Sequence, residues 1–375
     1  MIYFIFNNYT PNTAATNRIL GYLEIFEKEN IPVKVIYILP GLHDEVMNSH
    51  FKNIQVKYQW KHLPHKNKIC KGIIFFWSLY VIRKKIKKGD IVYTYGINAI
   101  MERLLGKKGV RYYAERTEHL EVTEKEPWPL GVSKTKCIEI CKKLDGLFVI
   151  SSPLRDFFVR FGIEGKKVHI INMIVDANRF ANIDKKNVRE RYIAYCGTAS
   201  NNKDGVNELI KAFGIVCNTL EDVKLYIIGK TPSIADKESN LLLIEKLGLA
   251  DKVVFTGIVP ANEMPQLLKN AEVLALDRPN SLQAEYGFPT KLGEYLLTGN
   301  PVVVTKVGDI PKYLEDGVSA LLSEERNEKD FSEKIIWALT HSKEAAVIGE
   351  NGKKVALKMF NSEIETRKII SIFQS

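Results

Sequence analysis

The segment from Gln283 to Thr305 (QAEYGFPTKLGEYLLTGNPVVVT) holds residue types that could bind a phosphate group. Proline is common at the start of a helix and glycine commonly follows its last turn, so the segment predicts a helix over Pro289–Thr298 after an irregular loop around Gly287. The unpaired N–H groups and the dipole of such a helix start favour a bound phosphate. Glu294 lies one turn further along, at a distance suited to a ribose diol attached to that phosphate.

Other groups could complete this phosphate site. The backbone from Phe288 to Lys291, including Thr290, offers N–H donors directly. Lys203 follows a predicted strand that ends at Gly197, and its ammonium could bind a diphosphate at the helix start. Gly229 and Gly257 also end predicted strands, where the backbone can approach a ligand closely.

The elements that must position these residues alternate between strand and helix along the whole chain. The predicted strands are Ile2–Phe6, Val33–Leu39, Ile54–Tyr58, Ile91–Tyr95, Arg111–Glu115, Leu147–Ile150, Val168–Ile171, Tyr192–Cys196, Lys224–Ile228, Val253–Thr256, Glu272–Leu276 and Pro301–Thr305. Short β-branched runs separated by amphipathic helices indicate an α/β fold with parallel, doubly wound sheets. About six strands in each half favour two Rossmann-like domains over one large sheet.

The domain boundary is expected in the polar segment Asp176–Arg191, which lacks hydrophobic periodicity. We expect an N-terminal domain over residues 1–178, a C-terminal domain over 190–350, and a last helix within 351–375 that packs back on the N-terminal domain. Two such domains would face a shared central cleft at the carboxyl ends of their strands.

Composition excludes several classes of protein. The chain has 375 residues and a formal net charge of +10, which favours an anionic partner. The sequence has neither a basic low-complexity tail nor zinc-finger spacing, so we expect no nucleic-acid partner. Five scattered cysteines and the lack of a signal-peptide pattern predict a cytoplasmic protein with reduced thiols.

Five segments of the second half together resemble the family-4 retaining glycosyltransferases, which have the two-domain GT-B fold. They occur in the order and spacing of that family and cover about half of the chain from Val168 onward. The segments are VHIINMIVDANRF (Val168–Phe180), YIAYCGTASNNKDGVNELIKAF (Tyr192–Phe213), LYIIGK (Leu225–Lys230), VVFTGIVPANEMPQLLKNAEVLAL (Val253–Leu276) and GFPTKLGEYLLTGNPVVVTKVGDIPKYLEDGVSALL (Gly287–Leu322).

The resemblance implies roles in binding the diphosphate of a nucleotide-sugar donor. Lys203 matches the family's diphosphate-binding Lys, whereas Thr198–Ala199 stand where the family has an Arg, so Lys291 would have to compensate. Glu294 matches the second Glu of a pair that binds the donor. Glu285 lies one position from the first Glu of that pair and could still reach the sugar.

The resemblance also implies where the base of the donor and the acceptor bind. Lys230 and the loop from Gly257 to Val259 would line the pocket for the nucleotide base.

In the first half, a predicted strand leads into YAERTEHL, where the family places an acidic or His contact to the donor sugar. The candidates there are His119, then Glu118 and Glu115, with Arg116 beside them on the acceptor side. Asn12 and Thr13 follow the first strand and would either face the acceptor or cap the next helix.

The sequence contains no Asp-x-Asp pair of the kind that holds a divalent metal against a diphosphate in the other large architecture of sugar transferases. Lysine and the helix dipole would then stabilise the leaving diphosphate, so we expect neither a metal nor a cofactor. In the family's usual mechanism a donor phosphate oxygen takes the acceptor proton, which removes the need for a dedicated base.

The segment Lys61–Lys88 holds nine Lys or Arg residues and no acidic residue around the apolar run IIFFWSLYVI. A basic helix with Trp77 and Phe75–Phe76 at its centre is typical of an anchor at an anionic membrane surface. It is equally compatible with a helix that packs into the first domain and has solvated basic ends. Both can also hold together: one face of the helix packs inward while the lysines contact anionic lipid headgroups.

The sequence therefore predicts a hexosyl- or N-acetylhexosaminyl-type glycosyltransferase. It would move a sugar from a nucleotide-diphosphate sugar to a glycan or a polyprenyl-diphosphate-linked acceptor in surface polysaccharide synthesis, at the inner face of the plasma membrane. Two alternatives stay open: a nucleotide-sugar 2-epimerase with the same fold, and a non-catalytic protein that binds a sugar nucleotide or a lipid.

Overall fold

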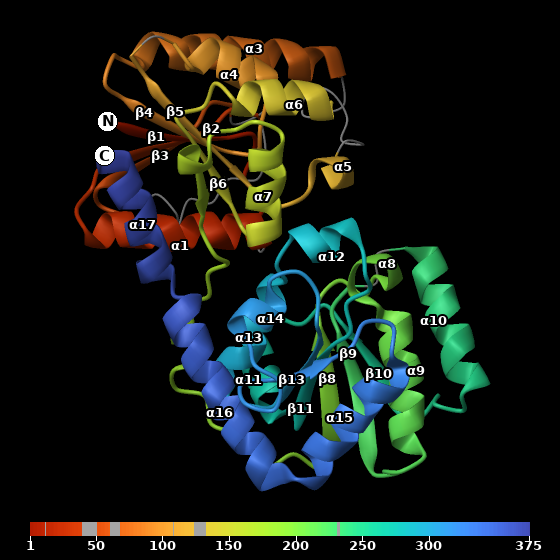
Figure 1. Ribbon diagram of the computed structural model, residues 1–375. Helices are drawn as coiled ribbons and strands as arrows, with labels where there is room; N and C mark the ends of the chain where they lie inside the picture. Colours follow the sequence, from red (N-terminus) through yellow and green to blue (C-terminus); the bar gives the residue numbers. More distant parts are fainter. Residues whose placement is uncertain (12, 40–50, 61–67, 108, 124–132, 231–232) are drawn as a thin grey trace. The chain divides into compact units, whose positions relative to one another are not determined.

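The computed structural model describes the chain except for residues 12, 40–50, 61–67, 108, 124–132 and 231–232 (Figure 1). The chain forms two compact units. The first consists of Met1–Asn172 together with Ser362–Ser375, and the second of Met173–Asn361. The chain therefore passes between the units twice, and the first passage comes before the polar segment Asp176–Arg191 in which we expected the boundary.

The first unit is built on a parallel sheet of seven strands in the order β3-β2-β1-β4-β5-β6-β7. The strands are β1 (Ile2–Phe6), β2 (Val33–Tyr37), β3 (Ile54–Tyr58), β4 (Ile91–Tyr95), β5 (Arg111–Arg116), β6 (Gly146–Val149) and β7 (Val168–Ile170). The helices are α1 (Ala14–Lys28), α3 (Lys68–Lys85), α4 (Ala99–Leu105), α5 (Leu120–Thr123), α6 (Lys134–Cys141), α7 (Ser152–Arg160), the 3-10 turn η1 (Gly165–Lys167) and α17 (Ser362–Gln374). Figure 1 shows α1 and α17 together on one side of this sheet, with α3 and α4 on the other.

Aromatic side chains form much of the core of the first unit. The ring of Tyr93 on β4 lies 4.5 Å from that of Phe4 and 6.1 Å from that of Phe148, measured between centroids. Phe373 of α17 packs on Phe148 at 5.9 Å and on Tyr113 at 4.9 Å. Because α17 supplies a core side chain, the C-terminal residues are an integral part of this unit.

The second unit contains a parallel sheet of six strands in the order β10-β9-β8-β11-β12-β13. The strands are β8 (Arg191–Cys196), β9 (Val223–Ile228), β10 (Val253–Gly257), β11 (Val273–Leu276), β12 (Val302–Thr305) and β13 (Leu321–Ser323). The helices are the 3-10 turn η2 (Ala177–Phe180), α8 (Asn201–Asp204), α9 (Val206–Cys217), α10 (Ile234–Lys246), α11 (Met264–Asn270), α12 (Leu282–Tyr286), α13 (Thr290–Leu297), α14 (Ile310–Tyr313), α15 (Glu328–Thr340) and α16 (Ser342–Met359).

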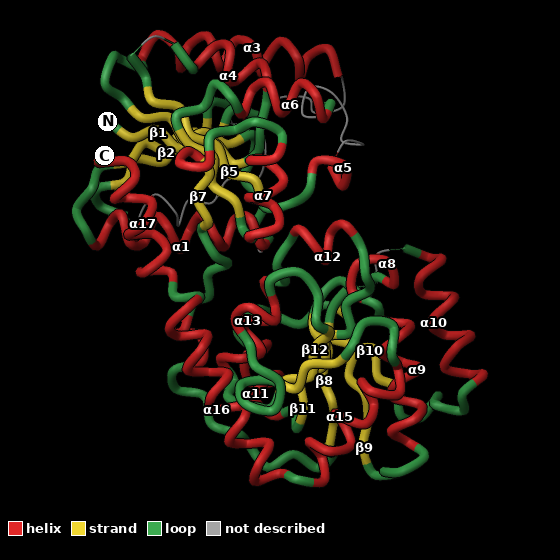
Figure 2. The backbone as a smooth tube through the Cα atoms, viewed as in Figure 1, coloured by secondary structure: helices red, strands yellow, loops and turns green. Residues whose placement is uncertain are grey.

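Helices cover the second sheet as expected of a doubly wound fold (Figure 2). Helix α9 packs against α10 and α15, and α13 packs against α16. Strands β11 and β12 are buried along their whole length, which explains their uninterrupted apolar sequences. The two parallel sheets confirm the predicted pair of Rossmann-like domains.

Three local predictions were wrong. The last helix is not continuous, because α16 ends at Met359 and α17 begins at Ser362. The loop expected around Gly287 is partly helical, since Ser281 caps the short helix α12. Pro289 is the N-cap of α13 with extended backbone angles, so the helix itself begins at Thr290.

Candidate functional site

The carboxyl edge of the second sheet has a point at which the chain changes direction. From β8 the chain moves outward to β9 and β10, and it then returns to place β11 on the other side of β8. The loops after β8 and β11 therefore lead away from each other. Ligands of doubly wound sheets bind at such a point. The residues that follow β8 and β11, Gly197 and Asp277, mark this position in the second unit.

A buried ion pair lies beside this position. The ammonium of Lys291, in the first turn of α13, lies 2.5 Å from the Asp204 carboxylate, and these side chains are 16% and 2% exposed. The hydroxyl of Tyr195 accepts from Lys291 at 3.0 Å and lies 2.8 Å from the same carboxylate. Three side chains from β8, α8 and α13 thus fix one cation at the strand ends.

The surroundings explain the electrostatics of this cluster. Burial lowers the pKa of Lys291, and the Asp204 carboxylate opposes that shift. Arg278, a second buried cation, adds to the lowering of that pKa. Burial also raises the pKa of Tyr195 well above its usual range, with the Asp204 charge adding to the effect. An arriving anion would meet two cations and one carboxylate here.

Two glycines at this edge of the sheet allow close contacts that a larger residue would prevent. A Cβ on Gly197 would lie 2.3 Å from the Lys291 ammonium, and one on Gly229 would lie 2.2 Å from the carbonyl oxygen of Gly197. Both have positive φ, 152° and 126°. Any larger residue would displace Lys291 or separate the loops after β8 and β9.

The start of α13 fits the predicted phosphate site in one respect. Its N-cap, Pro289, makes no side-chain hydrogen bond to the first turn. Backbone N–H groups at such a start are suited to an anion. Lys291 extends from this same turn toward Gly197, so the helix start and the buried cation lie together. Phe288 is buried beside them, and its ring packs on Tyr313 and Phe360.

Lys203 is placed differently from Lys291. It lies in the short helix α8, and its backbone N–H donates to the capping Ser200 hydroxyl at 3.3 Å. Its side chain is exposed, and among the described residues it forms no ion pair. The adjacent Asp204 is the residue of α8 that points into the cluster. The structure therefore brings Lys291 to Gly197, and the predicted contact of Lys203 with the diphosphate stays a prediction.

Glu294 lies one turn after Lys291 and is paired with a residue that sequence reasoning missed. The guanidinium of Arg179, from η2, forms an ion pair with the Glu294 carboxylate. The side chains are 31% and 27% exposed, so the pair remains accessible to solvent. The sequence could have indicated Arg179 through the motif VDANRF, in which it is the single basic residue. Glu285 is exposed on α12 and makes no described contact with this pair.

The loops after β9 and β10 are joined through backbone groups. Gly229 donates its N–H to the carbonyl of Gly257 at 3.0 Å, and Ala199 donates to the carbonyl of Lys230 at 2.8 Å. Gly257 is exposed and Val259 half-buried. Lys230 and Thr198 thus belong to loops that meet at the strand ends. Residues 231–232, which follow Lys230, lie outside the described part.

Strand β11 is followed by two buried charged residues that the sequence did not single out. Burial raises the pKa of Asp277 to about 7, with the charges of Glu208 and Glu328 adding to the effect. Arg278 donates to the carbonyl of Gln283 at 3.2 Å. Their place in the sequence could have identified them, because polar residues directly after a buried strand lie at the ligand-binding edge of a parallel sheet.

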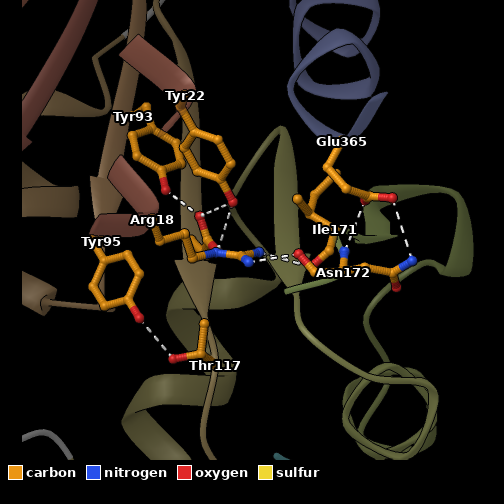
Figure 3. Close-up of polar contacts among 9 residues, drawn as sticks. Arg18, Tyr22, Tyr93, Tyr95, Thr117, Ile171, Asn172 and Glu365 are labelled. Carbon is orange, nitrogen blue, oxygen red and sulfur yellow. Dashed lines mark hydrogen bonds and ion pairs between the residues drawn. The ribbon is translucent and has the colours of Figure 1, made fainter. Parts of the chain in front are cut away.

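In the first unit, Glu115 occupies the core. Its side chain is fully buried and accepts from Arg18 at 2.5 Å, with the hydroxyls of Tyr22 and Tyr93 completing its contacts. Figure 3 shows Arg18 continuing to the backbone carbonyls of Ile171 and Asn172. Both oxygens of this carboxylate are hydrogen-bonded inside the core, so its burial does not support the predicted contact with a substrate.

The same network reaches α17. Asn172 donates its backbone N–H to Glu365 at 2.9 Å and its side-chain amide at 3.3 Å (Figure 3). Both are buried. Asn172 is the last residue of the first segment of this unit and Glu365 lies in the segment that returns, so the network ties the two segments together.

The other first-unit candidates are dispersed. His119 is buried against Phe157, at 4.5 Å between ring centroids, and burial lowers its pKa. Arg116 donates to the carbonyl of Glu118 at 3.0 Å, and both side chains are half-buried. Thr13 caps α1 by accepting from Thr16 at 3.2 Å. Asn12 lies outside the described residues. Their predicted contacts to the donor sugar or acceptor stay predictions.

Comparison with known proteins bears on both units. The family model of Glycosyl transferases group 1 matches residues 176–355. Mannosylfructose-phosphate synthase of Agrobacterium fabrum is 23% identical over 214 residues, which are 53% of this chain and 46% of that protein. A GDP-mannose-dependent phosphatidylinositol monomannoside mannosyltransferase of Mycolicibacterium smegmatis is 27% identical over 272 residues, 69% of each chain. The chain spans about half the length of the first curated relatives it matches.

Solved structures resemble the whole chain. Anabaena Alr3699/HepE in complex with UDP-glucose has a TM-score of 0.74 at 16% identity and covers 100% of this chain and 99% of its own. The lipopolysaccharide outer core galactosyltransferase WaaB has a TM-score of 0.70 at 17% identity, with 100% and 99% covered. Residues 176–355 therefore resemble a glycosyl transferases group 1 domain, and the chain as a whole has the GT-B fold.

Proposed function

We propose that this protein is a retaining glycosyltransferase of family 4 that uses a nucleotide-diphosphate sugar. The observation that carries the proposal is the buried ammonium of Lys291, which lies at the strand ends of the second unit beside the start of α13. The match to the glycosyl transferases group 1 model over the same residues supports it. So do the structures of Alr3699/HepE with UDP and with UDP-glucose.

In the proposed donor complex the diphosphate binds at the start of α13. Lys291 and Arg278 supply positive charge, and the backbone of Thr290 and Lys291 supplies N–H donors. Glu294 then binds the ribose hydroxyls, one turn further along the helix. The loops that contain Gly229, Lys230 and Gly257 contact the base through main-chain groups. Because cationic groups already lie at the diphosphate position, we propose that turnover requires no metal.

The proposed reaction transfers the sugar with its anomeric configuration kept. The acceptor hydroxyl oxygen bonds to the anomeric carbon on the face from which the diphosphate leaves, while the bond from that carbon to the diphosphate oxygen breaks. The hydroxyl proton moves to the leaving phosphate oxygen. Lys291 stabilises the charge that grows on the diphosphate, which is worth about 3 kcal/mol for one well-placed group in comparable sites.

The proposed acceptor is a glycan or a lipid-linked sugar in the assembly of a surface polysaccharide. One structural neighbour, WaaB, is a lipopolysaccharide outer core galactosyltransferase. The donor sugar is a hexose or an N-acetylhexosamine, in keeping with relatives named for mannosyl and N-acetylglucosaminyl chemistry. We place the reaction in the cytoplasm.

The test measures donor binding and turnover. Thermal stability is recorded with UDP-glucose, UDP-N-acetylglucosamine and GDP-mannose, since a ligand at one hundred times its Kd stabilises by about 2.7 kcal/mol. We expect one donor to raise Tm and to yield a product whose anomeric proton coupling matches that of the donor, with EDTA present. No stabilisation by any nucleotide sugar contradicts the proposal, an inverted product contradicts retention, and an isomerised donor formed without acceptor indicates an epimerase.

Lys203 provides a matched control for Lys291. We expect Lys291→Met to lose the donor-induced shift in Tm and Lys203→Met to keep it, because the Lys291 ammonium is buried at the strand ends and the Lys203 side chain is exposed on α8. Lys291→Met leaves the Asp204 carboxylate buried, so the variant is also made with Asp204→Asn, which restores a neutral site. Equal losses in the two lysine variants would show that Lys203 binds the diphosphate as the family motif implies.

A further inference from the structure

Helix α3 of the first unit has two apolar faces, of which one is packed and the other exposed. Phe75, Leu79 and Ile82 are fully buried and join the helix to the core. Ser78, on the same face, accepts from the Trp60 indole at 2.6 Å and donates to the carbonyl of Ile38 at 3.1 Å. The helix therefore has more apolar side chains than those that pack into the core of this unit.

The exposed face is a continuous apolar stripe. Its members recur at the helical spacing of three or four residues and are each 44–72% exposed: Ile69, Ile73, Phe76, Trp77 and Tyr80. Together with Gly72, which leaves a gap between the larger side chains, they line a shallow apolar hollow. Large apolar side chains gathered in this way on a surface mark an interaction site. We refer to these five side chains as the α3 stripe.

One cation adjoins the α3 stripe, and further lysines lie elsewhere on α3 or directly after it. Lys71, Lys84, Lys85, Lys87 and Lys88 are exposed, and none of them forms an ion pair with the described residues. The ammonium of Lys84 lies 4.6 Å from the ring centroid of Tyr80, next to the stripe. The side chain and charge of Lys57, on β3, lower the pKa of Lys85, and the charge of Lys34, on β2, adds to this effect. The C-terminal end of α3 is therefore strongly positive.

These features together identify the class of partner. Aromatic rings such as those of Trp77 and Tyr80 favour the boundary between lipid headgroups and acyl chains. Exposed lysines on the same helix and directly after it favour anionic headgroups. A second copy of the chain is a poor occupant, because pairing two α3 helices would bring two sets of lysines together without acidic partners in Lys61–Lys88.

We propose that the α3 stripe docks this protein on an anionic membrane surface, with the helix lying in the plane of the lipid headgroups. Helix α3 has 18 residues, which corresponds to a length of about 27 Å along the surface. In the described part of the chain, no helix has the length and apolarity needed to cross a bilayer. The stripe inserts among the headgroups while the lysines remain in contact with phosphates. This docking goes beyond the proposed sugar transfer and does not depend on it.

Flotation of the full chain with vesicles tests the proposal. We expect the protein to float with vesicles that contain phosphatidylglycerol at low salt, to float weakly with pure phosphatidylcholine, and to be released by high salt. The double substitution Phe76→Ser with Trp77→Ser should abolish flotation. Leu242→Ser on α10 is the matched control, because Leu242 is 66% exposed on a helix outside the stripe. Equal flotation of all three proteins overturns the proposal.

Two further measurements separate the charged and apolar contributions and exclude other occupants. Each of Lys84→Gln and Lys88→Gln should weaken partitioning about fivefold. The emission of Trp77 should shift to shorter wavelength on vesicles, and Trp77→Phe should remove that shift while keeping flotation. A wild-type protein that is dimeric without lipid, and monomeric as the double variant, contradicts the proposal by assigning the stripe to a second copy.

The outcome is independent of the proposed chemistry. The double variant should still show the donor-induced shift in Tm, because the stripe lies in the first unit and the donor residues lie in the second. Loss of flotation with donor binding kept supports docking alone. If the wild-type protein binds no donor, the proposed function is refuted. The flotation result would still decide the membrane docking by itself.

Discussion

The ammonium of Lys291 lies 2.5 Å from the carboxylate of Asp204, although the two residues are 87 positions apart in the chain. Lys291 lies in the first turn of α13, and Asp204 is the last residue of α8, which follows β8. Each would be an isolated buried charge without the other. The pair therefore holds α8 and α13 together at the position where we propose that the diphosphate binds.

The first prediction concerns the energetics of this pair. Lys291→Met and Asp204→Asn should each lower the free energy of unfolding by about 3–5 kcal/mol, because each leaves the partner's charge buried. The double variant should be more stable than the sum of the two losses implies, by about 0.5–3 kcal/mol. Chemical denaturation of the four proteins measures this coupling.

The exposed pair of Lys329 and Glu333 is the control for that cycle. Its nitrogen and oxygen lie 3.8 Å apart, and its side chains are 81% and 62% exposed. Its coupling should be at most about 0.5 kcal/mol. If the coupling between Lys291 and Asp204 is equally small, the two side chains do not form a buried pair in solution.

Much of the second unit was predictable because its signals are local. Short β-branched runs gave the strands of the sheet, and the sequence around Gly287 and Pro289 located the start of α13 to within one residue. The three-residue strand β13 was missed because so short a run has no periodicity. The last helix, predicted within 351–375, merged two helices because both are amphipathic and no proline or glycine separates them.

The partners of the site residues were harder to predict, since they come from distant segments. Spacing alone placed Lys203 after the correct strand but could not tell which of two lysines points toward Gly197. That depends on the turn at Gly205, whose left-handed φ of 59° ends α8 and leaves Asp204 buried. Arg179 lies 115 positions before Glu294, and nothing in the local sequence of either residue indicates that they meet.

The second prediction addresses Arg179 and Glu294. If Glu294 binds the ribose hydroxyls, the wild-type protein should bind a nucleotide diphosphate more tightly than its 2′,3′-dideoxy analogue, and Glu294→Ala should lose that preference. Arg179→Ala should weaken the preference without removing it, because Arg179 orients the carboxylate and does not itself accept from the diol. Calorimetric titration of both ligands gives the preference in each variant.

A conservative variant distinguishes orientation from general damage to the fold. Arg179→Lys keeps the charge and should restore part of the preference for the ribose, whereas Arg179→Met should not. The stability of these variants should change by no more than about 1 kcal/mol, since the pair is partly exposed. An unchanged preference in Glu294→Ala would remove Glu294 from the donor site.

The third prediction is a pH dependence of stability that originates at Asp277. Burial, with the nearby charges of Glu208 and Glu328, raises the pKa of Asp277 from 3.8 to about 7 in the folded state. The native state therefore binds this proton more tightly than the unfolded chain does. Between these two pKa values the unfolded chain is the state with fewer protons, so the contribution of Asp277 to stability falls as pH rises from about 4 to about 7.

Asp277→Asn isolates that contribution because it keeps the size of the side chain and removes the titration. The variant should be more stable than the wild-type protein at pH 8, by on the order of 2 kcal/mol, and the difference should shrink as pH falls toward 4. Glu208→Gln should lower the pKa of Asp277 and move the transition to lower pH, since it removes one of the charges that raise it. Urea denaturation at several pH values measures all three proteins. A difference between wild type and Asp277→Asn that stays constant from pH 4 to pH 8 would show that Asp277 does not titrate in this range.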